Sequence, residues 1–248
     1  MADPVKHARK FGLAYFALAA ILGGAIGTFV LLVQRPAPAP PPPWSIWKPT
    51  ASSPLERANE IATFVGAQYH LKSGHRLVNV AVVSPSAGND PIQYLAIAKK
   101  PNVTSRGDVD VVDAATTIMF NLCGSGKNCV MAEGKPSVAR GAMLRREALE
   151  LALYTFRYVD GVDAITALLP PKPNSPTYAV FFKRDDLDNQ LDHPLVRTLP
   201  RRRPPIPGRL SPNERKIVDD LTLTRYFRFE LQRANNGARV LVLRPVPV

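Results

Sequence analysis

The sequence predicts an α+β protein with an N-terminal transmembrane helix, a proline-rich stalk and one exported domain with a mostly antiparallel sheet and about four helices. Three observations support this prediction. Residues 11–33 carry no charged side chain, residues 36–43 are only proline and alanine, and the remainder mixes helical with strand periodicity. We therefore expect a cytoplasmic tail over 1–10, a membrane span over 11–33, a linker over 34–50 and a domain over 51–248.

The apolar run is long enough to cross a membrane. As a helix, residues 11–33 would extend about 34 Å at ~1.5 Å per residue, against roughly 30 Å for a hydrocarbon core. A cleavable signal peptide would have a shorter apolar region, of about 7–15 residues, and a small-x-small cleavage site. The A-x-A that comes after the apolar run, at residues 37–39, is followed directly by Pro40, which makes it a poor cleavage site. The run is therefore predicted to be an uncleaved signal anchor of a single-pass membrane protein.

Flanking charges predict the orientation. Lys6, Arg9 and Lys10 precede the run, whereas only Arg35 follows it closely. Because cytoplasmic flanks are enriched in Lys and Arg, we expect a cytoplasmic N-terminus and an extracytoplasmic C-terminal domain at the cell membrane.

Gly23 and Gly27 form a G-x-x-x-G within the run. Small residues at this spacing let two membrane helices approach closely, which predicts transmembrane helix packing in a possible homodimer. Glycine is also common in membrane helices without any pairing role, and that alternative stays open.

The proline run at residues 36–43 excludes both a helix and a central strand, because proline fixes φ and lacks an N–H donor. Polyproline II at ~3.1 Å per residue would give a stiff stalk of roughly 25 Å. Trp44 and Trp47 follow it, and we expect them to pack on the folded domain or on a partner.

Apolar periodicity divides the domain into helices and strands, with no internal repeat. The predicted helices are 54–71, 111–122, 140–158 and 212–221. The predicted strands are 76–84, 92–98, 163–169, 177–183, 226–232 and 239–244. Most strands follow one another as hairpins, and Asn236-Gly237 is a type I′ turn signal, so the sheet should be largely antiparallel.

The formal net charge of +12 favours anionic partners: lipid headgroups, wall polymers or acidic protein faces. Nucleic acid is an unlikely partner for an exported domain. The basic residues of one proline-rich stretch have no acidic residue among them, and they are our candidate anionic-partner site: Arg197, Arg201, Arg202, Arg203 and Arg209. An ordinary solvated loop is the alternative.

Cys123 and Cys129 are the only cysteines, and an even pair in an exported domain predicts a disulfide, with free thiols as the alternative. The intervening Gly-Ser-Gly-Lys lacks the spacing of a phosphate-binding loop. The four histidines and the two aspartate clusters match no metal or catalytic pattern, so we expect no metal, no cofactor and no catalytic residue.

The layout of short tail, anchor and exported domain resembles that of bacterial cell-envelope complex subunits, such as those of secretion and conjugation systems. It is a likeness of layout, and no motif carries it. We therefore expect a membrane-tethered, non-enzymatic interaction or scaffold protein of the cell envelope that binds an anionic or protein partner. The alternative is an exported, membrane-anchored hydrolase of wall polymer or lipid with dispersed catalytic residues.

Overall fold

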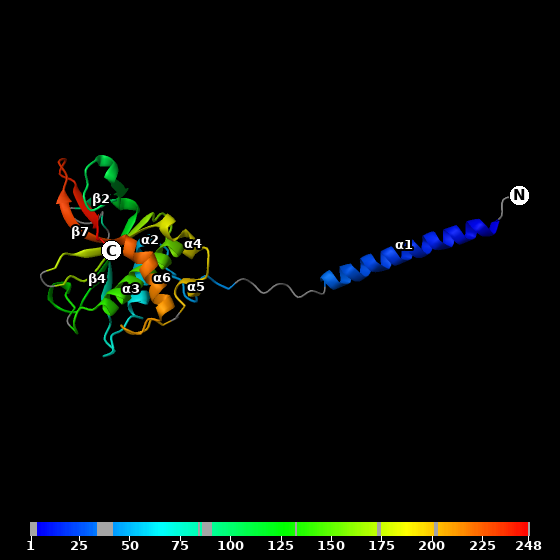
Figure 1. Cartoon of the computed structure of the whole chain (residues 1–248), viewed down its shortest axis with the longest axis horizontal. Coiled ribbons are helices and arrows are strands. Elements are labelled where there is room, and N and C mark those ends of the chain that lie inside the picture. The colour runs from blue at the N-terminus through cyan, green and yellow to red at the C-terminus, as the bar shows by residue number, and fades with distance from the viewer. Residues whose placement is uncertain are drawn as a thin grey trace. The chain divides into compact units, whose positions relative to one another are not determined.

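A computed structural model describes residues 4–33, 42–83, 85, 91–131, 133–172, 175–200 and 203–247. The chain divides into two compact units, Met1–Pro42 and Pro43–Val248. Helix α1, Pro4–Val33, is the regular element of the first unit (Figure 1). The second unit holds every other helix and strand described here.

Within the described ranges, none of the helices combines the length and the apolar character that crossing a membrane requires. A span needs about 20 consecutive, predominantly apolar residues in one helix. Helix α1 begins at Pro4, whereas the predicted span began at residue 11. The helix therefore includes the polar tail with its basic residues as well as the apolar run. The transmembrane helix and signal anchor predicted for residues 11–33 are therefore wrong. The packing role predicted for Gly23 and Gly27 presupposed that span, and a single chain does not test it.

The second unit is α+β, and its sheet is mixed instead of largely antiparallel. Its described residues form eight strands in the order β1-β4-β5-β6-β7-β8-β2-β3, where six strands were predicted. Neighbouring strands run antiparallel except for the β4–β5 and β2–β8 pairs, which are parallel. The strands are β1 Asn79–Val83, β2 Ile92–Ala98, β3 Val109–Asp113, β4 Thr117–Cys123, β5 Ala164–Leu168, β6 Tyr178–Lys183, β7 Tyr226–Arg233 and β8 Arg239–Pro245.

Five further helices, α2 to α6, lie together on one side of the second unit (Figure 1). Helix α3 is central, because fourteen of its residues are buried and it packs against both α2 and α6. Proline follows the N-cap serine of both α2 and α6, a favoured start for a helix. The helices are α2 Pro54–Gly66, α3 Val138–Tyr158, α4 Asp188–Leu191, α5 Leu195–Thr198 and α6 Pro212–Thr222. The second unit therefore has five described α-helices where about four were predicted for the domain, and α1 brings the described total to six.

The predicted helix over residues 111–122 does not form. This stretch contains strand β3, a short 3₁₀ turn (Ala114–Thr116) and strand β4. Its valine, threonine and isoleucine residues are β-branched and favour strands. Met119 and Phe120 are neighbours in β4 and both are buried, so both faces of the strand are covered. A strand buried on both faces loses the alternation that distinguishes it from a helix.

The core has two parts, one on each face of β4–β6. The helix-side core joins α2 and α3 to Phe120, Ile165 and Phe182 of these strands, among others. The sheet-side core joins Met119 and Phe181 to leucines of β2 and β8. The sheet therefore curls, and its second half covers the face that the helices leave open. An ion pair of 3.0 Å between Lys183, at the end of β6, and Asp110 of β3 bridges the two halves.

The packed unit includes the tryptophans that follow the proline run. Trp47 stacks on Phe64 of α2 with ring centroids 3.9 Å apart, and Trp44 meets Tyr154 of α3 edge-on at 5.6 Å. The amide of Leu195 donates to the carbonyl oxygen of Trp44 at 2.7 Å. The second compact unit, which begins at Pro43, therefore includes both tryptophans.

Candidate functional site

Strand β4, helix α3 and strand β5 form a β-α-β unit. The two strands are adjacent and parallel, with Thr117 opposite Ala164 and Asn121 opposite Leu168. The carboxyl ends of the two strands therefore lie side by side at one end of the sheet. At this end the segment that follows β4 leads into the N-terminus of α3. In open α/β sheets this edge is the usual place for a ligand, because helix N-termini and connecting loops converge there.

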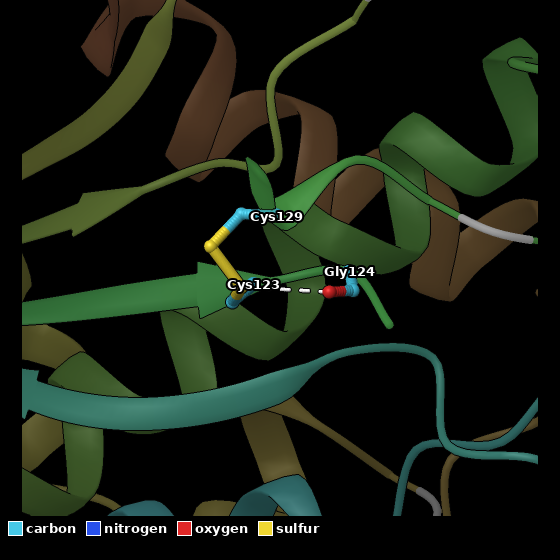
Figure 2. Close-up of a disulfide and its surroundings, with 3 residues drawn as sticks. All are labelled: Cys123, Gly124 and Cys129. Atoms are coloured by element: carbon cyan, nitrogen blue, oxygen red, sulfur yellow. Dashed lines mark hydrogen bonds between the residues drawn. A yellow bond between two sulfur atoms is a disulfide. The ribbon is translucent and has the colours of Figure 1, made fainter. Parts of the chain in front are cut away.

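The segment from β4 to α3 is closed by a disulfide. The Sγ atoms of Cys123 and Cys129 are 2.02 Å apart, and Figure 2 shows the bond crossing from the end of β4 to the returning loop. Within the bridged loop, the amide of Gly124 donates to the carbonyl of Cys129 at 2.9 Å, and Gly126 donates to Val130 at 2.8 Å. These bonds direct Val130 and the residues after it toward α3.

The local sequence explains why this loop is tight. A Cβ on Gly124 would lie 2.4 Å from the carbonyl oxygen of Val130, so only glycine fits there. Asn128 and Cys129 have φ values of 55° and 62°, in the left-handed region that non-glycine residues seldom adopt. Asparagine is among the residues that tolerate this region best, and the disulfide holds its neighbour there.

A cavity of about 260 Å³ opens at this edge. Its walls come from the loop after the disulfide, the first two turns of α3, the loop after β5, and the first residues of β6 and β7. The described lining residues are Val130, Met131, Gly134, Pro136, Ser137, Arg140, Gly141, Leu144, Arg145, Leu169, Pro170, Pro171, Lys172, Tyr178 and Tyr226. We call this the α3 cavity.

The charged residues of the described lining are all basic: Arg140, Arg145 and Lys172. The first turn of α3 contains no acidic residue, and its cap is the Ser137 hydroxyl, which accepts from the Arg140 amide at 3.2 Å. The positive end of a helix dipole normally attracts acidic side chains and disfavours basic ones. Arginine near this end therefore opposes helix stability, and a bound anion would relieve that opposition.

Tyr178 and Tyr226 form one wall of the α3 cavity. Their rings stack with centroids 5.1 Å apart at an interplanar angle of 16°. Burial, followed by the neighbouring Tyr178, raises the pKa of Tyr226 to about 12. Its hydroxyl therefore keeps its proton at neutral pH and is able to donate a hydrogen bond to an anion.

A buried ionic network lies on α3 directly after Arg145. Arg146 donates to Glu150 Oε2 at 2.9 Å and to Glu214 Oε1 at 2.8 Å, and the Tyr69 hydroxyl donates to Glu150 at 2.6 Å. This network joins the segment after α2 to the start of α6. No local pattern could have predicted this network, because its members are up to 145 positions apart in the chain.

Glu147 is fully buried beside this network. Neither of its carboxyl oxygens has a hydrogen-bond partner among the described residues. Burial, and then the charge of Glu150, raises the pKa of Glu147 well above its usual value, while Arg146 opposes the shift. The fold therefore disfavours the ionised form of the Glu147 carboxyl.

The structure does not bring the predicted basic site to the α3 cavity. Arg197 is exposed in α5, and Arg203 and Arg209 are exposed in the segment before α6. Arg201 and Arg202 lie outside the described residues. Asp220 lines the same surface hollow as Arg197, so this end of the run has an acidic neighbour that sequence distance concealed.

One histidine has a carboxylate partner that sequence distance also concealed. His75 Nδ1 and the Ser73 hydroxyl both lie 2.9 Å from Glu133 Oε2. In a serine hydrolase the imidazole lies between the carboxylate and the hydroxyl, whereas here the hydroxyl donates to the carboxylate itself. The arrangement is a surface hydrogen-bond cluster, and His75 is largely exposed.

Two of the clustered aspartates, Asp108 and Asp110, are engaged by protein groups. Asp108 accepts from the amides of Thr104 and Ser105, and Asp110 pairs with Lys99 and Lys183. Among the described residues, no group of three or more His, Cys, Asp or Glu side chains is placed to hold a metal ion.

The α3 cavity thus lies where ligands commonly bind in this kind of fold, its walls are mostly apolar, and its described charged residues are all basic. No known protein family, curated protein or solved structure matches this chain, so its function has to be argued from its own residues.

Proposed function

We propose that the domain is a non-enzymatic binding module that recognises an anionic partner through the α3 cavity. The observation that carries the proposal is the cavity's lining, with three cationic side chains, no described acidic one, and apolar walls. Binding sites are concave and mostly apolar, with a few polar groups that fix orientation.

The described lining also favours binding over hydrolysis. It contains no cysteine, histidine, aspartate or glutamate to act as nucleophile or general base. The Ser137 hydroxyl is already used as the cap of α3. We therefore favour the interaction protein over the exported hydrolase.

The disulfide supports a further part of the proposal, that the domain works in an oxidising compartment. Disulfides persist in extracellular and periplasmic proteins and are rare in the cytosol. A basic domain there would meet anionic envelope components or acidic proteins, and the net charge of +12 favours such encounters.

Blocking the cavity tests the proposal. A Cβ on Gly141 would have its nearest neighbour, Arg145 Nη1, 3.9 Å away, so Gly141→Leu is expected to fill the cavity without a backbone clash. Leucine also has a higher helix propensity than glycine, so the fold should not be weakened. Gly107→Leu is the matched control, because Gly107 lies in a 3₁₀ turn that does not line the cavity.

Calorimetric titration of the full chain would use three anion classes: inorganic phosphate, an arenesulfonate and a small carboxylate. We expect at least one class to bind the natural chain and the Gly107→Leu variant with one-to-one stoichiometry. Gly141→Leu should abolish that binding while leaving thermal stability unchanged or higher. Failure of all three classes to bind, or equal binding to Gly141→Leu, would reject the proposal.

A further inference from the structure

The positive charge that the α3 cavity offers a ligand is smaller than its three cations imply. Arg145 donates through Nη2 to Asp219, and through Nε to Thr222 at 3.0 Å. Asp219 also accepts from Arg215, so it compensates Arg145 only in part.

Arg140 is also partly engaged. It donates through Nη1 to the carbonyl oxygen of Glu133 at 2.7 Å. Hydrogen bonds from Ser73 and His75 lower the pKa of the Glu133 carboxyl, and the charge of Arg140 adds to this effect. Lys172 is exposed and forms no ion pair with a described residue. Lys172 therefore keeps its charge, whereas Arg145 is partly compensated by Asp219, and this favours a ligand of low charge over a polyanion.

The walls set the other half of the ligand's chemistry. Met131, Leu144, Leu169, Pro170 and Pro171 give the cavity a largely apolar surface. A volume of about 260 Å³ is slightly below the range of roughly 300–1,000 Å³ for drug-sized ligands. A ligand that fills it has an apolar body of one ring or a short branched chain. A bare inorganic anion would leave these walls uncovered.

We infer that the α3 cavity binds a small monocarboxylate with an apolar aromatic or branched aliphatic body. The inference rests on the proposed function and names its ligand class. The carboxylate lies against the cationic side of the cavity, where Arg140 and Lys172 donate charge-assisted hydrogen bonds. The apolar body lies among Leu144, Leu169 and the stacked Tyr178–Tyr226 pair.

Calorimetric titration of the full chain with four probes tests the ligand class. 3-Phenylpropionate has the predicted chemistry, 3-phenylpropanamide lacks its charge, acetate lacks its body, and inorganic phosphate differs in both. We expect 3-phenylpropionate to bind at least about tenfold more tightly than each of the other three, since hydrogen bonds to charged groups and apolar burial each contribute that much.

Removing the charge of Lys172 tests the proposal in a second way, because this exposed side chain is not part of the core. Lys172→Gln should weaken 3-phenylpropionate binding about tenfold and leave 3-phenylpropanamide unchanged. Lys72→Gln, also at an exposed lysine, is the matched control and should change neither.

The outcomes separate the two proposals. Phosphate binding that is lost in Gly141→Leu, without carboxylate binding, would overturn the ligand class and keep the proposed function. Equal affinity for the acid and its amide would overturn the role of the charge. No binding by any of the four probes would overturn the ligand class, and the proposed function would fall with it if the arenesulfonate also failed to bind.

Discussion

Replacing Glu147 by methionine is expected to stabilise the protein. The carboxyl is fully buried, and neither oxygen has a described partner. An unsatisfied buried polar group costs about 1–3 kcal/mol, and methionine has a similar unbranched shape, so imperfect repacking should cost less than about 1.5 kcal/mol. Near pH 4, where the carboxyl is protonated in both the folded and the unfolded state, we expect Glu147→Met to raise the free energy of unfolding by up to about 3 kcal/mol.

The pH dependence of the free energy of unfolding tests independently whether Glu147→Met stabilises the protein. The pKa of Glu147 is raised in the folded protein above its unfolded value of about 4.3. The free energy of unfolding is therefore highest below about pH 4.3 and falls as pH rises above it, because the unfolded chain then loses a proton that the folded chain keeps. One such proton changes stability by at most about 1.4 kcal/mol per pH unit. The advantage of Glu147→Met over the natural chain should therefore grow as pH rises from about 4.3.

The matched control is the same substitution one helical turn later. Glu150 accepts from Tyr69 and Arg146, so Glu150→Met leaves a buried arginine short of a partner and should cost about 3–5 kcal/mol. Denaturant unfolding followed by tryptophan fluorescence measures both variants. If Glu147→Met destabilises the protein as much as Glu150→Met does, Glu147 has a partner and the reasoning is refuted.

Three other predictions concern the loop, the N-terminal segment and the basic run. Joint replacement of Cys123 and Cys129 by serine should lower the free energy of unfolding by no more than the ~3 kcal/mol expected for a 15-residue loop; two free thiols in the unreduced natural chain would contradict the disulfide. A chain starting at residue 51 should melt at a lower temperature than one starting at residue 43, because a buried tryptophan contributes about 3–5 kcal/mol; equal melting temperatures in calorimetry would contradict the packing of Trp44. Replacing Arg201, Arg202 and Arg203 by glutamine should leave unfolding unchanged and weaken salt-sensitive binding to anionic liposomes; unchanged binding at low salt would leave the run as a solvated loop.

Local signals predicted most of the elements correctly. The predicted strand 92–98 coincides with β2, and the predicted helix 212–221 nearly coincides with α6, because proline, serine and periodic apolar residues act over a few positions. The type I′ turn predicted at Asn236-Gly237 is only partly right. Gly237 has a φ of 83° but Asn236 does not lie at positive φ, so the turn is not type I′.

Long-range pairing could not be predicted in this way. The parallel β2–β8 and β4–β5 pairs join segments that no turn connects, and they make the sheet mixed. The site depends on the same long-range contacts, since Tyr226 meets Tyr178 only after the sheet has formed. Glu214 shows that a local helix-capping signal predicts only part of what a residue does. Ser211 accepts from its amide as a cap predicts, but its side chain pairs with Arg146.

The position of β8 has a consequence for the order of folding. In the sheet β8 lies between β7 and β2, and it follows both in the chain. The β2 side of the β2–β3 hairpin therefore stays unpaired until β8 has been synthesised, and until then Leu95 lacks its contact with Leu241. Non-local pairing is slow, and an open apolar edge is prone to aggregation. We therefore expect a nascent chain halted before β8 to be more prone to aggregation than one that includes β8.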